Sequence, residues 1–195
     1  TVNAILYNSA QPIFIDVDLD TMGLSPRAVA TFLEEFGEIR DGFCFNKKTN
    51  KKIAACMPMH TFGFPVDLEE LIIVCNNWNI PIVEDAAESM GSEYKNRPVG
   101  SFGKLGVFSF NGNKIITSGG GGAIVTDDWE LGAKAKHLTT TAKRPHPYEY
   151  VHDDMGYNFR MPNINAALAC AQLEQLDLFL ADKRNLATAY ANYFT

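Results

Sequence analysis

The sequence is poor in several features that identify whole classes of protein. Its 195 residues include 4 cysteines and 4 histidines, and 17 basic side chains against 23 acidic ones give a formal charge of −6. Phosphate backbones are bound chiefly by clustered lysines and arginines, so this charge and the lack of a basic stripe argue against a nucleic-acid partner. No apolar run approaches the roughly 18 residues that a membrane-spanning helix needs, and no basic leader is present. We therefore expect a cytoplasmic protein without a membrane partner.

The cysteines and histidines also lack the spacings of disulfide and metal sites. No C-x-x-C pair occurs, and the cysteines stand mostly in apolar surroundings, which predicts reduced, buried thiols at Cys44, Cys56, Cys75 and Cys170. The histidines show no H-E-x-x-H or other paired-ligand spacing, so we expect no metal. The only basic cluster, residues 47–52, brackets Thr49-Asn50 and is typical of a solvated hairpin tip between runs 43–45 and 53–57.

Apolar runs typical of buried strands alternate with segments of helical period, which predicts an α/β fold with a mainly parallel sheet covered by helices. Capping residues and apolar period predict helices over 26–36 and 68–77, and a third capped by Asp127 and Glu130. After Pro162 the pattern predicts either one long amphipathic helix or a kinked pair. The expected strands are residues 12–17, 80–84, 105–110 and 123–126.

Both ends of the sequence fall inside apolar helical patterns, at residues 1–6 and 190–195. We therefore interpret residues 1–195 as a single domain that is a fragment of a longer protein.

Acidic residues follow the expected strand at 80–84. Asp85 and Glu88 stand where that strand ends, and open α/β sheets place their ligands at this edge. The alternative interpretation of Asp85 is a helix N-cap with acidic neighbours.

A single lysine, Lys114, follows Ser109-Phe110-Asn111-Gly112-Asn113 and precedes Ile115-Ile116-Thr117-Ser118. Apolar surroundings favour the neutral form of an amine, and a neutral amine is what attacks an aldehyde. The alternative is a surface lysine beside a turn.

The glycines at 119–122 lack both the G-x-x-x-x-G-K-[ST] and the G-x-G-x-x-G pattern, which argues against triphosphate and dinucleotide sites. Such glycines instead let a chain pass close to a flat ligand or a partner backbone.

Four segments together resemble the DegT/DnrJ/StrS family of sugar aminotransferases, which are pyridoxal-phosphate (PLP) enzymes of fold type I. They are MPMHTFGFPVDLEEL from Met57, IPIVEDAAESMGSEY from Ile80, SFGKLGVFSFNGNKIITSGGGGAIVTDD from Ser101 and GYNFRMPNINAALACAQLEQL from Gly156. Within the family, the chain is most similar to enzymes that make 4-amino-4,6-dideoxy sugars for bacillosamine or legionaminic acid. The resemblance implies the three-layer α/β/α large domain, without its N-terminal part and the small C-terminal domain.

The resemblance also implies a role for each candidate residue. Lys114 corresponds to the Schiff-base lysine, and Asp85 to the acid that pairs with the pyridine nitrogen of PLP. Ser109 corresponds to a ligand of the cofactor phosphate, and Asn158 to a residue that reaches the phosphate of the neighbouring subunit in a homodimer with shared active sites. The alternative for Asn158 is a turn residue that stabilises its own backbone. Glu88 matches a position that contacts the ring hydroxyl, where many relatives carry Gln or His, and a plain solvated acid is the alternative.

The implied activity is transamination of a nucleotide-linked 4-keto-6-deoxy sugar for the synthesis of cell-surface polysaccharide. We expect UDP-4-keto-6-deoxy-N-acetylhexosamine as substrate and glutamate as amino donor. Two alternatives stay open from the residues alone. One is a PLP-binding regulatory or sensor protein without turnover, and the other is a structural fragment in which Asp85 and Lys114 form a buried ion pair.

Overall fold

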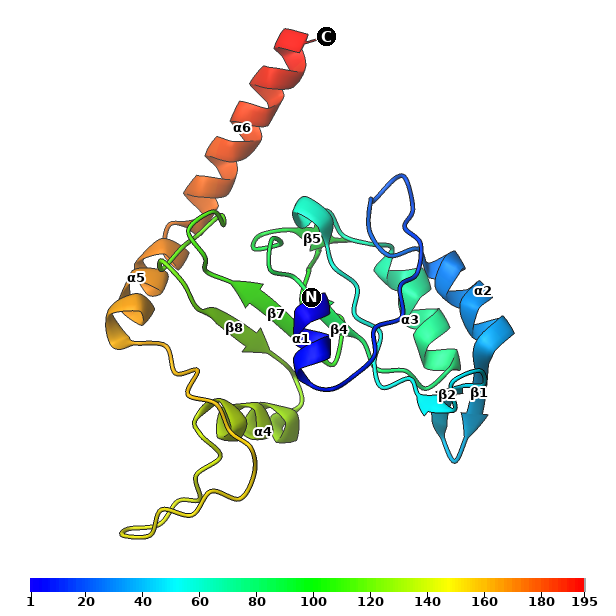
Figure 1. The fold of residues 1–195 in the computed structure, drawn as a ribbon. Helices are drawn as coiled ribbons and strands as arrows, with labels where there is room; N and C mark the ends of the chain where they lie inside the picture. Colours follow the sequence, from blue (N-terminus) through cyan, green and yellow to red (C-terminus); the bar gives the residue numbers. More distant parts are fainter. Residues whose placement is uncertain (195) are drawn as a thin grey trace. The chain divides into compact units, whose positions relative to one another are not determined.

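The computed structural model describes residues 1–194, which form two compact units (Figure 1). Unit 1 is Thr1–Phe108, and unit 2 begins at Ser109. Unit 1 combines helices with parallel and antiparallel strands, and unit 2 combines one strand with three helices. The predicted α/β class is therefore confirmed.

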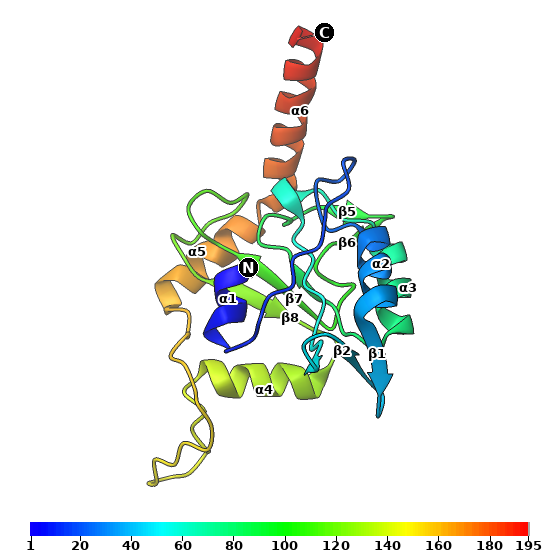
Figure 2. The ribbon, with the colours of Figure 1, turned by 45° about the vertical axis from the view of Figure 1, so that its right-hand side comes forward.

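Two helices of unit 1 form where their capping residues predict them. α2 (Pro26–Phe36) begins with a proline in its first turn, and the Ser25 hydroxyl accepts the Ala28 N–H at 3.3 Å. α3 (Leu68–Asn77) begins at Asp67, whose carboxylate accepts the Glu70 N–H at 3.1 Å. The two helices lie side by side (Figures 1 and 2). Their inward faces join the core of unit 1, whose buried members are Val29, Leu33, Cys44, Val66, Leu68, Leu71, Cys75, Ile80 and Ile82.

The predicted hairpin is present, but its second strand is residues 51–52 and not the predicted run 53–57, and the hairpin belongs to a larger antiparallel sheet. β1 (Gly37–Arg40) pairs with β2 (Phe43–Asn46), and β2 pairs with the short β3 (Lys51–Lys52). The side chain of Asn46 accepts the backbone N–H groups of Lys48 and Thr49, which closes the turn. β1 was not predicted, because it follows α2 directly and Gly37 is both the C-cap of the helix and the first residue of the strand.

The strand predicted at residues 12–17 is wrong. This segment belongs to no strand, and it makes only one isolated bridge, between Val17 and Leu24. Ile13 and Phe14 are 43% and 73% exposed. An apolar run becomes a strand only where a neighbouring backbone supplies hydrogen bonds, and the described chain supplies almost none here.

The parallel strands of unit 1 position the acidic residues. β4 (Val83–Asp85) pairs in parallel with β7 (Leu105–Ser109), with Asp85 opposite Val107. On the other side of β4, bridges join Cys56 to Ile82 and Met59 to Asp85. The remaining elements of unit 1 are α1 (Val2–Tyr7), the 3-10 turn η1 (Thr61–Gly63), and the two-stranded β5 (Glu93–Tyr94) and β6 (Arg97–Pro98).

Unit 2 contains β8 (Gly122–Val125), which contacts α4 (Trp129–Thr139), followed by α5 (Asn163–Leu173) and α6 (Leu176–Phe194). Asp128 caps α4, one residue later than the predicted Asp127, because the Asp128 carboxylate accepts the N–H groups of Glu130 and Leu131. Of the two alternatives after Pro162, the structure has the pair of helices (Figure 1).

The cysteines are free thiols, and their burial varies. Cys44 and Cys75 are buried as predicted, Cys56 is half-buried, and Cys170 is exposed on α5, where the prediction is wrong. No helix in residues 1–194 is long and apolar enough to cross a membrane. The same residues contain no group of three or more His, Cys, Asp or Glu side chains placed to hold a metal ion.

Candidate active site

Asp85 is the last residue of β4, and its backbone is fixed on both sides. Its N–H donates to the Pro58 carbonyl at 2.9 Å, and its carbonyl accepts the His60 N–H at 3.1 Å. Its carboxylate accepts the Ala87 N–H at 3.2 Å and the Thr1 hydroxyl. The half-buried carboxylate is thus held at the carboxyl end of a parallel strand, where α/β sheets bind ligands.

Glu84, the preceding residue, is a fully buried carboxylate with a complete set of donors. One oxygen accepts the N–H groups of Phe102 and Gly103, each at 2.6 Å. The other accepts the Gly100 N–H at 2.8 Å and lies 3.2 Å from His60 Nε2. Glu84 therefore joins β4 to the loop 99–103 and to the buried His60.

The charge state of this pair follows from the second nitrogen of the His60 ring. Nδ1 accepts the Val66 N–H at 3.3 Å, so Nε2 carries the proton that is donated to Glu84. Burial raises the pKa of Glu84. The hydrogen bonds from His60 and from three backbone N–H groups lower this pKa by more than burial raises it, so the net pKa is below the ordinary value. Glu84 is thus a buried anion that neutral donors stabilise.

Sequence reasoning missed the role of Glu84, although a signal was present. Alternation along a strand places Ile82, Glu84 and Ala86 on one face, and Ile82 and Ala86 are buried. A carboxylate between two buried apolar residues needs partners, and here they come from far along the chain.

Glu88 follows Asp85 by three residues and is half-buried. Its carboxylate accepts the backbone N–H of Phe62 at 3.0 Å. Glu88 therefore has a structural partner within unit 1, which argues against the alternative of a plain solvated acid. Asp85 and Glu88 are both brought to the turn that follows β4.

In unit 2, Ser109 and Lys114 lie on one tight loop. The Ser109 hydroxyl accepts the Asn111 N–H at 3.3 Å, and the Lys114 N–H donates to the Asn111 carbonyl at 3.1 Å. The Asn111 side chain also donates to the Asn113 side chain at 3.1 Å. The backbone of Lys114 is therefore held in a turn just after β7, and its side chain is half-buried.

The α5 helix braces the rest of this loop. Gln172 accepts the Thr117 N–H at 3.2 Å, and Asn165 donates to the Ser118 carbonyl at 2.5 Å. The buried Ile116, only 1% exposed, anchors the segment between Lys114 and these contacts. Such bracing favours a fixed position for a reactive amine.

The glycines after Lys114 have the properties expected of a loop that passes close to a ligand. Gly119 and Gly121 have φ values of 81° and 88°, which other residues rarely adopt. A Cβ atom placed on Gly112, Gly119 or Gly120 would meet nothing within 4 Å. The glycine-rich loop thus leaves open space beside it.

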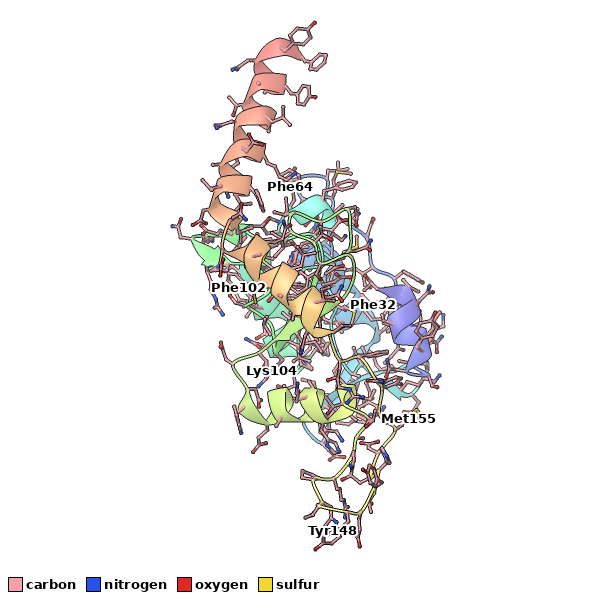
Figure 3. All side chains as sticks on the ribbon, turned by 90° about the vertical axis from the view of Figure 1, so that its left-hand side faces the viewer. Phe32, Phe64, Phe102, Lys104, Tyr148 and Met155 are labelled. Carbon is pink, nitrogen blue, oxygen red and sulfur yellow. The ribbon has the colours of Figure 1, made fainter. Side chains whose placement is uncertain are left out.

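Asn158 lies in an exposed segment of unit 2 that bridges to Thr140. Its side-chain oxygen accepts Arg160 Nε at 2.7 Å. The same segment forms a long loop that has Tyr148 near its far end (Figure 3). Within this loop, hydrogen bonds from His137 and Arg144 lower the pKa of Asp153 to about 2. The Asn158 residue itself is exposed.

Comparison with known proteins gives this arrangement its context. The model of the DegT/DnrJ/EryC1/StrS aminotransferase family matches residues 1–195. The chain belongs to this family. EpsN of Bacillus subtilis strain 168, whose name describes a pyridoxal phosphate-dependent aminotransferase, is 39% identical over 192 residues, which are 98% of this chain and 47% of EpsN. The GDP-perosamine synthase of Escherichia coli O157:H7 is 40% identical over 190 residues, covering 97% of this chain and 48% of the synthase.

Solved structures of the family share the fold. PseC of Helicobacter pylori, an aminotransferase of pseudaminic acid biosynthesis, superposes with a TM-score of 0.76 and 28% identity over 90% of this chain and 43% of PseC. The sugar aminotransferase CalS13 of Micromonospora echinospora gives a TM-score of 0.80 with 25% identity over 98% of this chain and 50% of CalS13. The predicted fold type I is thus confirmed, and the chain spans about half the length of the relatives it matches.

The side chains described above fit PLP, which is the cofactor of this family. An amine can bind its aldehyde, a carboxylate can pair with its pyridinium, and a hydroxyl can donate to its phosphate. Asp85 lies in unit 1, and Ser109 and Lys114 lie in unit 2.

Proposed function

We propose that the protein is a PLP-dependent aminotransferase for a nucleotide-linked keto sugar, in which this chain supplies the cofactor-bearing large domain. The observation that carries the proposal is the half-buried Lys114, held on a loop braced by α5, in a chain that matches an aminotransferase family over its whole length. A lysine in such a position is the covalent anchor that transamination requires.

Each residue then has a defined task. When bound, PLP supplies an electron sink for the carbon next to the transferred nitrogen. Lys114 Nζ would anchor the cofactor covalently, and once released by the substrate amine it would be the base that moves a proton during transamination. Asp85 keeps a proton on the pyridine nitrogen, because a fixed carboxylate favours the charged pyridinium beside it. The Ser109 hydroxyl would donate a hydrogen bond to the cofactor phosphate.

Asn158 acts in this proposal across a homodimer interface, on the phosphate held by the other subunit. The exposure of its side chain supports such a role. Two-fold symmetry then gives two equivalent sites, each completed by Asn158 of the partner chain.

The finer proposal concerns the substrate. We propose amination at C4 of UDP-4-keto-6-deoxy-N-acetylhexosamine, with glutamate as donor, for cell-surface polysaccharide synthesis. The names of the relatives support the class of nucleotide-linked sugars, and they include a GDP-perosamine synthase as well as the pseudaminic acid aminotransferase PseC. The nucleotide is therefore the feature that the experiment must decide.

A cytoplasmic location belongs to the same proposal. All four cysteines are free thiols, including the exposed Cys170. Reducing compartments keep thiols in this state.

The test uses the full-length protein loaded with PLP. A panel of UDP-linked and GDP-linked 4-keto-6-deoxy sugars is offered with glutamate, and the amino sugar is identified by mass spectrometry and NMR. We expect amination of the UDP-linked N-acetylhexosamine, whereas preference for a GDP-linked sugar would overturn the finer proposal only. Exchange with small α-keto acids alone would place the protein in another group of aminotransferases. Bound PLP without any amine transfer would favour a regulatory protein.

A further inference from the structure

Phe62 has a backbone conformation that a phenylalanine rarely adopts. Its φ and ψ are 52° and 23°, in the left-handed region, although it lies inside the η1 turn. Its side chain is 75% exposed. Asn and Asp tolerate this region through local side-chain hydrogen bonds, but a phenyl ring has none to offer. The strain must therefore be held by the surroundings, and such strain gathers at functional sites.

Contacts from several directions hold the turn around Phe62. Glu88 accepts its N–H at 3.0 Å, and the Thr61 hydroxyl donates to the Met22 carbonyl at 3.0 Å. The Gly63 N–H donates to the carbonyl of His60, whose ring is buried against Glu84. A Cβ atom on Gly63 would lie 2.8 Å from the Glu88 carbonyl oxygen, so this turn packs directly against the turn that follows β4.

The turn stands at the same strand end as Asp85. Met59 pairs in parallel with Asp85, and the His60 N–H donates to the Asp85 carbonyl at 3.1 Å. Phe62 follows two residues later. The exposed ring is thus presented where the segment leaves the carboxyl edge of β4.

A hollow of about 570 Å³ lies beside this turn in unit 1. Met59, Thr61 and Met22 line it, whereas Phe62 follows Thr61 and is not among the described residues of its wall. Thr1, which donates to the Asp85 carboxylate, lines it as well. Its size is in the range of small-molecule sites, and apolar side chains dominate its wall.

We propose that the Phe62 ring contacts a ring face of the nucleotide-sugar substrate, and that Glu88 is the positioning residue that holds Phe62 in place. The inference rests on the aminotransferase function proposed above. An exposed aromatic face binds flat rings and the apolar faces of sugars. In this inference the Glu88 carboxylate acts on the Phe62 backbone, through the N–H that it accepts at 3.0 Å. A contact with the cofactor ring hydroxyl, as the family resemblance implies, is the competing role that the second experiment separates.

The first experiment replaces the ring in full-length, PLP-loaded protein. Phe62→Leu should raise the KM for the keto sugar that the wild type aminates by about three- to tenfold, as expected for the loss of an aromatic contact. The glutamate half-reaction and the visible absorption of bound PLP should not change. Phe62→Gly, which suits a positive φ, provides a second variant that folds without strain and should show the same rise.

Phe64→Leu is the matched control. Phe64 is another exposed aromatic of the same segment, labelled in Figure 3, but its backbone is extended, with φ −78° and ψ 122°. Its substitution should leave KM within about twofold of the wild type. Competition by UMP and GMP then shows whether the lost contact is with the base or with the sugar, because only a base contact weakens inhibition by the free nucleotide.

The second experiment tests the positioning role. Glu88→Ala removes the acceptor of the Phe62 N–H and should raise KM as Phe62→Leu does, whereas Glu88→Gln keeps an oxygen acceptor and should restore it. The double variant Glu88→Ala/Phe62→Leu should be no worse than either single variant, since both remove one contact. Were Glu88 a ligand of the cofactor ring hydroxyl, Glu88→Gln would shift the pH titration of the visible band and the double variant would be additive.

Two results overturn the inference. The first is an unchanged KM for the keto sugar in both Phe62 variants, when the wild type aminates that sugar. The second is a Phe62→Leu protein that loses stability in urea at unchanged KM, because the ring then packs against the protein itself. If the wild type aminates no nucleotide sugar, the proposed function fails and the inference fails with it. The two failures are therefore distinguishable.

Discussion

Glu84→Gln gives a sharp test of the interactions that hold β4. The glutamine Oε1 can still accept the N–H groups of Phe102 and Gly103, which share one carboxylate oxygen. Its amide nitrogen, however, must then face two donors, the Gly100 N–H and His60 Nε2. The His60 ring cannot exchange its proton between nitrogens without losing the Val66 N–H at Nδ1. The substitution thus turns two hydrogen bonds into two opposed donors.

The size of the effect follows from this geometry. Each hydrogen bond to a charged acceptor contributes about 1.5–3 kcal/mol, and the substitution removes two of them. We therefore expect Glu84→Gln to lower the free energy of unfolding by about 3–5 kcal/mol, a large part of the roughly 5–15 kcal/mol of a typical domain. Urea unfolding of the full-length protein, followed by circular dichroism, measures the loss. The exposed Glu93→Gln is the control and should change it by less than about 0.5 kcal/mol.

The pH dependence provides an independent check. The pKa of Glu84 is lowered in the folded state, so its contribution is present above the unfolded pKa of about 4.3 and is lost as the pH falls through the folded value. The difference in stability between wild type and Glu84→Gln should therefore narrow on acidification. A variant with the wild-type urea midpoint at neutral pH, or a difference that stays constant down to acid pH, would refute this account of Glu84.

Three further predictions concern the proposed chemistry of the full-length protein. Borohydride should fix PLP on Lys114, as peptide mapping can show, and Lys114→Ala should abolish turnover; label on another lysine, such as Lys104, contradicts the assignment. Asp85→Asn should lower the transamination rate by at least about a hundredfold, because losing a desolvated charge partner costs several kcal/mol and each 1.36 kcal/mol of activation free energy is a tenfold change in rate. A near-wild-type rate would mean that Asp85 only caps the turn that follows it. Refolding equal amounts of Lys114→Ala and Asn158→Ala chains, each inactive alone, should restore about a quarter of wild-type activity, because about half the dimers are mixed and each mixed dimer has one intact site. No recovery would mean that Asn158 serves its own chain.

Local signals predicted the helices of unit 1 and the general position of its strands. Ser25 with Pro26, and Asp67 with Glu70, fix the starts of α2 and α3 through hydrogen bonds between neighbours in sequence. The strand predicted at residues 80–84 is the right kind of element, but β4 begins only at Val83. Pairing with β7 and with the segment 56–60 sets that boundary, and propensity does not encode it. The strand predicted at residues 12–17 failed for the same reason.

The candidate site, like the fold, could be predicted from the sequence only in part. The sequence alone determined the α/β class and singled out Asp85 and Lys114 as candidates, because these depend on residue type and local spacing. The resemblance of its segments to the family added Ser109 and Asn158. The tertiary structure decided that Glu84 is a buried anion bound by groups 16 to 24 residues away, and that Glu88 holds the strained backbone of Phe62. Contacts of this length are made only when the chain folds, since a carboxylate enters the interior only where donors from distant segments meet it. The sequence therefore names the reactive groups, and the packing of separate segments decides which polar groups hold them in place.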